Sequence, residues 1–325
     1  MLASGDWFRS DDNTARTRLL MAGALAGSLL LLITSMVFSW PVATGGAGGA
    51  MTAEEQREAA FEAPTGSCLT WTPPNGDDIR ITDCAGSHLF EVTSTVDISA
   101  EHPENAPAPD TAAWQKIAED KCTPGATTYL GGVLDPFGKY TVNALKPNDA
   151  QWADGDRKLR CGLQTAAPSG TLVPSTGTAA RADQSNVHEP GTCLALEGQK
   201  IGDPINCSEP HAFEIVGAAD LGPAFPGDYP TEDQQTESAV ELCAQVANAY
   251  TGGVDLAAKK LTLYSDTLKP ESWAAGSRKV DCKVGAKLPS GDGLAPITNS
   301  VRATPPPVSS TPVPSSAPVP STPGG

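Results

Sequence analysis

Residues 84–92 read Cys84-Ala-Gly-Ser-His88-Leu-Phe90-Glu91-Val92, and residues 207–215 read Cys207-Ser-Glu-Pro-His211-Ala-Phe213-Glu214-Ile215. Both stretches place a histidine four residues after a cysteine and a glutamate three residues after that histidine. Self-similarity at this level is typical of a duplicated structural unit.

The repetition extends to all eight cysteines. The last two cysteines of each set are 39 residues apart in both copies (122 to 161 and 243 to 282). Before the fourth cysteine, Trp152-Ala-Asp-Gly-Asp-Arg157-Lys-Leu-Arg-Cys161 corresponds to Trp273-Ala-Ala-Gly-Ser-Arg278-Lys-Val-Asp-Cys282. The sequence therefore predicts two tandem homologous modules, with Cys68, Cys84, Cys122 and Cys161 in the first and Cys193, Cys207, Cys243 and Cys282 in the second.

The hydrophobic pattern of each module predicts an α+β fold. Apolar residues alternate within residues 79–98 and 159–163, as in half-buried strands. Within residues 114–122 the apolar residues recur at helical spacing instead, which predicts a helix. We expect Pro124 to end that helix. In the second module, Thr231-x-x-Gln234 resembles a capping box before the corresponding helix. Each third cysteine is thus expected on a helix and each fourth on a strand.

The cysteines indicate a disulfide framework. All eight follow residue 40, they come as four per module, and none stands in a Cys-x-x-Cys zinc spacing. Four cysteines allow three pairings per module. The helix and strand positions favour the pairs Cys68–Cys84, Cys122–Cys161, Cys193–Cys207 and Cys243–Cys282.

Residues Leu19 to Trp40 predict a single membrane-spanning helix. These 22 residues carry no charge, and a helix of this length is long enough to cross a bilayer. Arg9, Arg16 and Arg18 precede the span, and the next basic residue is Arg57, so the positive-inside rule puts the N-terminus in the cytoplasm. We expect a single-pass protein of the cell membrane with most of its chain outside the cell. A cleaved signal peptide is the alternative, since small residues follow the span.

The remaining composition sets the boundaries of the domains. The net charge of −16 falls entirely after residue 40, which argues against nucleic acid as a partner. Polar residues predict a linker between the modules, and Pro, Ser and Thr predict a disordered tail. The expected organisation is a cytoplasmic N-terminus (1–18), a transmembrane helix (19–40), a stalk (41–65), module one (66–164), a linker (165–190), module two (191–288) and a disordered tail (289–325).

The paired His and Glu residues are the first candidates for a site. His88 with Glu91, and His211 with Glu214, offer only two ligands per module, fewer than a zinc site needs. A spacing of three on a regular strand also sends two side chains to opposite faces. We interpret both pairs as structural and predict no metal.

The second candidates are Trp152 with Arg157 and Trp273 with Arg278. A tryptophan beside a cation can stack on a ligand such as a sugar. It can equally cover one end of a sheet, because tryptophan is usually buried. The modules contain neither Gly-x-Ser-x-Gly nor Ser-x-x-Lys, and oxidised cysteines leave no thiol nucleophile. We therefore expect neither an enzyme nor a cofactor.

The modules resemble the septum-formation domain family of actinobacteria. The likeness rests on Cys68, Asp83, Cys84, His88, Glu91, Val92, Cys122, Trp152 and Cys161, and on Cys193, Cys207, His211, Glu214, Ile215, Cys243, Trp273 and Cys282. Asn206 departs from the pattern, where the first module has the acidic Asp83. The family brings no catalytic residues.

The resemblance implies a non-enzymatic, membrane-anchored binding or scaffold protein of the cell envelope, involved in septum formation and cell division. Its expected partners are divisome proteins or peptidoglycan. An extracellular ligand-sensing or cell-wall-polymer-binding module is the alternative that the sequence leaves open.

Overall fold

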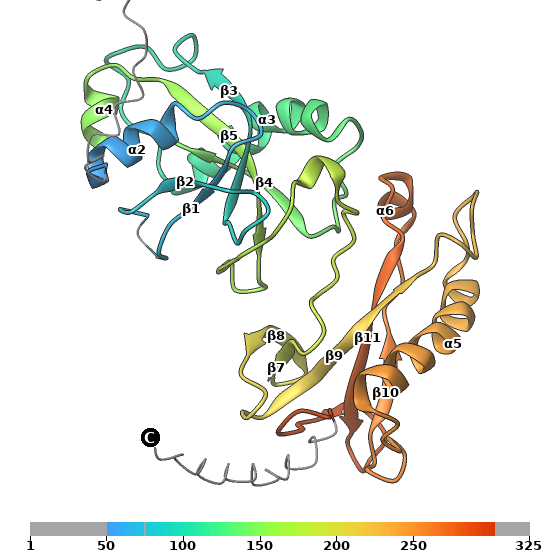
Figure 1. Ribbon diagram of the computed structural model, residues 1–325. Coiled ribbons are helices and arrows are strands. Elements are labelled where there is room, and N and C mark those ends of the chain that lie inside the picture. The colour runs from blue at the N-terminus through green and yellow to red at the C-terminus, as the bar shows by residue number, and fades with distance from the viewer. Residues whose placement is uncertain (1–50, 75, 303–325) are drawn as a thin grey trace, which may run out of the picture. The chain divides into compact units, whose positions relative to one another are not determined.

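The computed structural model describes residues 51–302, apart from residue 75 (Figure 1). The predicted span Leu19–Trp40 and the predicted cytoplasmic N-terminus lie outside these residues, as does most of the predicted tail. Within the described part of the chain, no helix combines the length and the apolar character needed to cross a membrane.

Two antiparallel sheets of six strands organise the described residues. In the first sheet the strand order is β2-β1-β3-β5-β4, and β6 pairs with β5. Its strands are β1 (Cys68–Thr70), β2 (Arg80–Thr82), β3 (Phe90–Asp97), β4 (Tyr140–Leu145), β5 (Lys158–Ala166) and β6 (Leu172–Val173).

The second sheet has the corresponding order β8-β7-β9-β11-β10, and β12 pairs with β11. Its strands are β7 (Cys193–Glu197), β8 (Lys200–Ile205), β9 (His211–Asp220), β10 (Thr262–Ser265), β11 (Lys279–Lys287) and β12 (Leu294–Ala295). This mixture of helices and sheets confirms the predicted α+β class.

Each sheet packs against one long helix, α3 (Thr111–Leu130) or α5 (Glu232–Thr251). The side chain of Asp110 caps α3, and the predicted capping box of Thr231 and Gln234 begins α5. Both helices end at a glycine in the left-handed conformation, Gly131 or Gly252, which satisfies carbonyls of the last turn.

Pro124 does not end its helix, so that prediction is wrong: α3 continues for six more residues to Leu130. A proline inside a helix costs about 3 kcal/mol, because it removes one hydrogen bond and crowds the preceding turn. Tertiary packing offsets this cost, since Ala118, Cys122 and Ala126 form one fully buried face on the sheet side of α3.

Four disulfides staple the two folds. Cys68–Cys84 joins β1 to the turn after β2, and Cys193–Cys207 joins β7 to the turn after β8. Cys122–Cys161 and Cys243–Cys282 each tie the long helix to a central strand. These are the pairs that the sequence favours, and no cysteine of the described residues is free.

The predicted stalk is partly helical. Residues 53–61 form α2 (Ala53–Phe61), which begins at a capping box made by Thr52 and Glu55. Ala60 and Ala63 are buried in one cluster with Leu69 of β1 and Ile79, which precedes β2. The prediction of a stalk over residues 41–65 missed this helix, in which Ala60 is the buried residue, because one small apolar residue gives no helical hydrophobic pattern.

The predicted linker, residues 165–190, is also structured. β5 extends to residue 166, residues 172–173 pair with it as β6, and η1 (Ala179–Arg181) follows. Further on, the backbone N–H of His188 donates to Asp281, whose carboxylate also contacts the His188 ring at 2.7 Å. The polar composition of this stretch reflects side chains that bind backbone and carboxylate groups, not a free chain.

The first part of the predicted disordered tail, residues 289–325, is also structured. Residues 294–295 form β12 on the edge of β11, and Val301 is buried in the second core. Residues 172–179 and 294–301 therefore occupy corresponding places, each after the central strand of a sheet. We refer to them as the first and second return segments.

Candidate functional site

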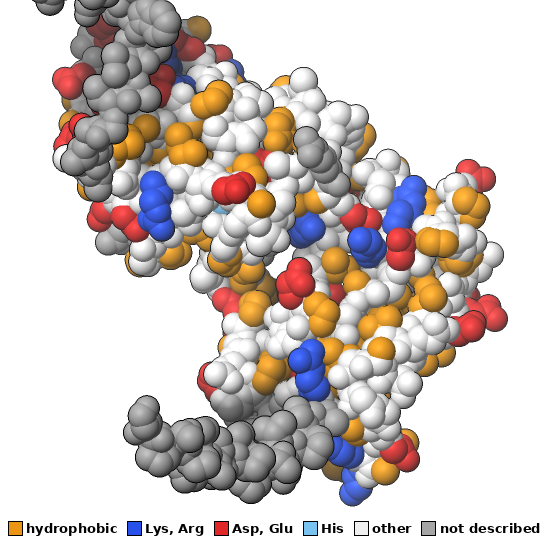
Figure 2. All heavy atoms as spheres, viewed as in Figure 1, with side chains coloured by type: hydrophobic (Ala, Val, Ile, Leu, Met, Phe, Trp, Pro, Cys, Tyr) orange, Lys and Arg blue, Asp and Glu red, His pale blue; other side chains and the backbone are white. Residues whose placement is uncertain are grey.

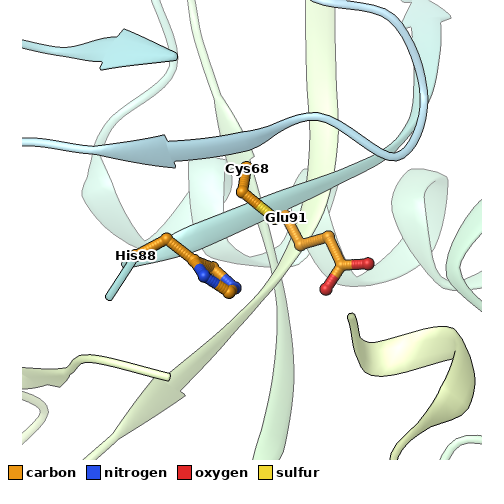
Figure 3. A group of neighbouring side chains, drawn as sticks. All are labelled: Cys68, His88 and Glu91. Atoms are coloured by element: carbon orange, nitrogen blue, oxygen red, sulfur yellow. The ribbon is translucent and has the colours of Figure 1, made fainter. Parts of the chain in front are cut away.

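A buried group of one histidine, one glutamate and one disulfide sulfur lies in each sheet. In the first, His88 and Glu91 are 1% and 2% exposed, and their polar atoms lie within 4.8 Å of each other and of Cys68 Sγ (Figure 3). The second sheet repeats the group with Cys193, His211 and Glu214.

The histidine and the glutamate therefore point to the same side, contrary to the expectation of opposite faces. In the first sheet, His88 precedes β3 and forms only an isolated bridge with Ser175, so strand alternation does not reach it. In the second sheet, the pairing of β7 with β9 shifts register between Leu194 and Ala195, opposite His211. Such a bulge re-aims a side chain.

His88 has a partner at each ring nitrogen. Nδ1 lies 3.0 Å from the carbonyl oxygen of Gly86, which can only accept, so Nδ1 carries the proton. Nε2 lies 3.3 Å from the hydroxyl oxygen of Ser175 in the first return segment. The ring thus joins the turn before β3 to that segment.

His211 keeps only one of these partners. Its Nδ1 donates to the carbonyl oxygen of Glu209 at 2.7 Å. Its Nε2 is buried and has no hydrogen-bond partner among the described residues. Ile297 lies opposite His211 where Ser175 lies opposite His88. The side chain of Ile297 has no hydrogen-bonding group.

Glu91 connects three parts of the first fold. One carboxylate oxygen accepts from the hydroxyl of Tyr129 near the end of α3. The other accepts from the backbone N–H of Ala179, at the end of the first return segment, at 2.7 Å. The carboxylate therefore holds a helix and a return segment on β3.

Glu214 does the same in the second fold. The hydroxyls of Tyr250 and Ser300 both donate to its Oε1 at 2.6 Å. The backbone N–H of Val301 donates to its Oε2 at 2.6 Å. Buried carboxylates are tolerated when they are hydrogen-bonded in this way.

This arrangement favours the structural interpretation of both pairs. The sulfurs of Cys68 and Cys193 belong to disulfides, and it is the thiolate that ligates metals or attacks substrates. Each carboxylate is already bound by its own fold.

The negative charge of Glu91 affects its neighbourhood. Burial, followed by the charges of Glu91 and Asp183, raises the pKa of Tyr140 to about 12. In the second fold, burial and the hydrogen bond to Glu214 raise the pKa of Tyr250. In both tyrosines the raised pKa means that the folded protein favours the neutral phenol.

Trp152 and Arg157 are interior residues. Trp152 is 5% exposed, and its indole N–H donates to the carbonyl oxygen of Ala106. The guanidinium of Arg157 lies 3.7 Å from the centre of the Trp152 ring. It donates to five backbone carbonyls, those of His102, Pro103, Glu104, Trp152 and Asp156.

Trp273 and Arg278 repeat the arrangement. The indole N–H of Trp273 donates to the carbonyl oxygen of Gly227, and Arg278 lies 4.0 Å from the ring centre. In each pair the protein's own arginine covers a face of the tryptophan ring, and both tryptophans are 5% exposed. These contacts favour the packing interpretation of the four residues over ligand stacking.

The groups that donate hydrogen bonds to the two glutamates were not predicted, although the chain repeats them. Tyr129 and Tyr250 both stand two residues before a Gly-Gly-Val. Pro174-Ser-Thr-Gly177 corresponds to Pro296-Ile-Thr-Asn299, and Gly177 and Asn299 both have positive φ. Their backbone N–H groups donate to the carbonyl oxygens of Cys84 and Cys207 at 2.7 Å.

The described part of the face in Figure 2 shows no concentration of positive charge. On the described part of the face in Figure 2, Lys and Arg side chains are interspersed with acidic and apolar ones and form no single basic area. This agrees with the net charge of −16.

Comparison with known proteins identifies the family. The septum formation family matches residues 65–282. Two relatives from Mycobacterium tuberculosis are "Uncharacterized membrane protein MT3943" (strain CDC 1551 / Oshkosh) and "Uncharacterized membrane protein Rv3835" (strain ATCC 25618 / H37Rv). Each is 34% identical over 319 residues, which cover 91% of this chain and 69% of the relative. No solved structure matches the chain. The predicted resemblance is thus confirmed: the chain belongs to the septum-formation family.

Proposed function

We propose that this protein is a non-enzymatic, membrane-anchored binding or scaffold protein of the cell envelope that acts in septum formation and cell division. The family match over residues 65–282 carries this proposal. The two mycobacterial relatives, both named as membrane proteins, support the membrane part of it.

The proposed anchor is Leu19–Trp40, with the N-terminus in the cytoplasm and the two sheets outside. Two observations support this orientation. Three arginines precede the span and none follows until Arg57. Four disulfides staple the folds beyond it, and disulfides persist in oxidising compartments.

A scaffold role suits the buried groups better than catalysis does. Glu91 and Glu214 are fully enclosed and hydrogen-bonded within their own folds, with no access for a substrate. The common strand order and the corresponding disulfides support tandem homologous modules. Two copies of one rigid fold give a membrane protein two related surfaces for divisome proteins or peptidoglycan.

The position of the protein in dividing cells tests this proposal. A fluorescent protein fused to the N-terminus, on the proposed cytoplasmic side, should concentrate at midcell in an actinobacterial host. A control fusion that contains only residues 1–50 should label the membrane evenly. Even labelling by the full chain as well would contradict a septal role.

A further inference from the structure

A polar groove of about 740 Å³ lies in the first fold, away from the buried His and Glu. Residues of α2 line one side of it, and residues of α4 (Asp149–Ala153) and the start of β5 line the other. Figure 1 shows where these three elements lie in the first fold. Its volume lies within the range of small-ligand sites. No helix is described between η1 and β7, so the second sheet has no equivalent wall.

Two arginines in the groove have unmatched donors. Arg160 is 5% exposed and donates to Thr95 and Glu62, but its Nε–H has no partner among the described residues. The Nε–H of Arg57 on α2 is also buried without a described partner. Native proteins hold few unmatched buried donors, because each one loses its hydrogen bonds to water without replacement. Both arginines line the groove.

The edges of the groove carry the opposite charge. Glu54, Glu58, Asp77 and Asp154 line it, are exposed, and form no ion pair within 4.0 Å among the described residues. With Glu62 and Asp156, six carboxylates face three cationic side chains in the lining. This net negative charge disfavours a purely anionic ligand such as an acidic membrane surface.

We infer that the groove binds a short peptide that carries both a free carboxylate and ammonium groups. The guanidinium groups of Arg57 and Arg160 would receive the carboxylate, because planar guanidinium donors match its two oxygens. The exposed carboxylates at the edges would receive the ammonium groups. Phe61, which also lines the groove, offers an apolar surface for the aliphatic part. This inference goes beyond the proposed septal role and does not depend on it.

The tripeptide Lys-Ala-Ala is a suitable probe, since it has one carboxylate and two ammonium groups. Isothermal titration calorimetry with the full-length protein in detergent should detect its binding. The same tripeptide with an amidated C-terminus should bind at least about tenfold more weakly, a loss of about 1.4 kcal/mol. Failure of the free tripeptide to bind, or equal binding of the amide, would overturn the inference.

Variants locate the site. Arg57→Gln should weaken binding of Lys-Ala-Ala at least about tenfold, whereas Arg80→Gln, an exposed arginine paired with Asp78, should leave it unchanged. Asp154→Asn should weaken binding of the tripeptide and of its amide alike, and this exposed position carries little risk for folding. Wild-type affinity in both Arg57→Gln and Asp154→Asn would contradict the inference. So would Arg57-dependent binding of phosphatidylglycerol vesicles without binding of the tripeptide.

Discussion

The hydroxyl of Tyr250 donates a hydrogen bond of 2.6 Å to the buried carboxylate of Glu214, and Tyr129 stands in the same relationship to Glu91. Each bond joins the end of the long helix to the strand that carries the glutamate. The same carboxylate also receives a backbone N–H of the return segment. One buried charge therefore holds three elements that the hydrophobic pattern alone would leave loosely positioned.

Tyr250→Phe should lower the free energy of unfolding by about 1.5–3 kcal/mol, the range for a hydrogen bond to a charged group. Tyr264→Phe is a matched control, because the hydroxyl of Tyr264 is buried without a partner among the described residues. Its removal should be neutral or stabilising. Urea denaturation of both variants measures the difference, and an equal loss in the two would argue against a special role for the Glu214 contact.

Tyr140→Phe should change the stability at high pH. The pKa of Tyr140 is raised to about 12 by burial and by the charges of Glu91 and Asp183, whereas an unfolded chain has a value of about 10. Between these values the folded state holds a proton that the unfolded state releases. The stabilisation that comes from the raised pKa of Tyr140 is therefore complete below pH 10 and is lost as pH rises to 12. Two pKa units correspond to about 2.7 kcal/mol.

Denaturation midpoints measured at pH 8 and at pH 11 test this. The variant should lose less stability than the wild type between the two values. An absorbance titration at 295 nm should also lack the tyrosine that ionises last. An unchanged alkaline loss in the variant would show that Tyr140 titrates normally.

Much of the fold followed from the sequence because its signals are strong and repeated. Cys122 was expected on a helix and Cys161 on a strand, and a disulfide joins α3 to β5 at these residues. The return segments were missed because they are short and only two residues long as strands. Their order comes from backbone contacts to buried side chains, which hydrophobic periodicity does not record.

The candidate site was predicted less well, for a specific reason. The residues His88, Glu91, His211 and Glu214 were identified, but regular alternation put each pair on opposite faces. A bridge outside β3 and a register shift beside β9 bring them together instead. A bulge depends on strand pairing that is distant in sequence, so the local pattern cannot reveal it.

The two disulfides of a module should contribute unequally. Cys122–Cys161 closes a loop of 39 residues and Cys68–Cys84 one of 16. Loop entropy then gives about 4 and about 3 kcal/mol. The variant with alanine at both Cys122 and Cys161 should therefore unfold at a lower urea concentration than the variant with alanine at both Cys68 and Cys84. The opposite order would mean that packing around Cys68, not loop length, dominates.

Thiol labelling in intact cells tests the proposed membrane orientation. Because the structure pairs every native cysteine, a cysteine introduced by substitution would be the reactive one. A membrane-impermeant maleimide should label Ser309→Cys, beyond the second fold, and should not label Ser4→Cys, before the span, until the cells are lysed. The positive-inside rule predicts this asymmetry from Arg9, Arg16 and Arg18. Labelling of Ser4→Cys in intact cells would reverse the orientation and would place the disulfides in a reducing compartment, where they do not persist.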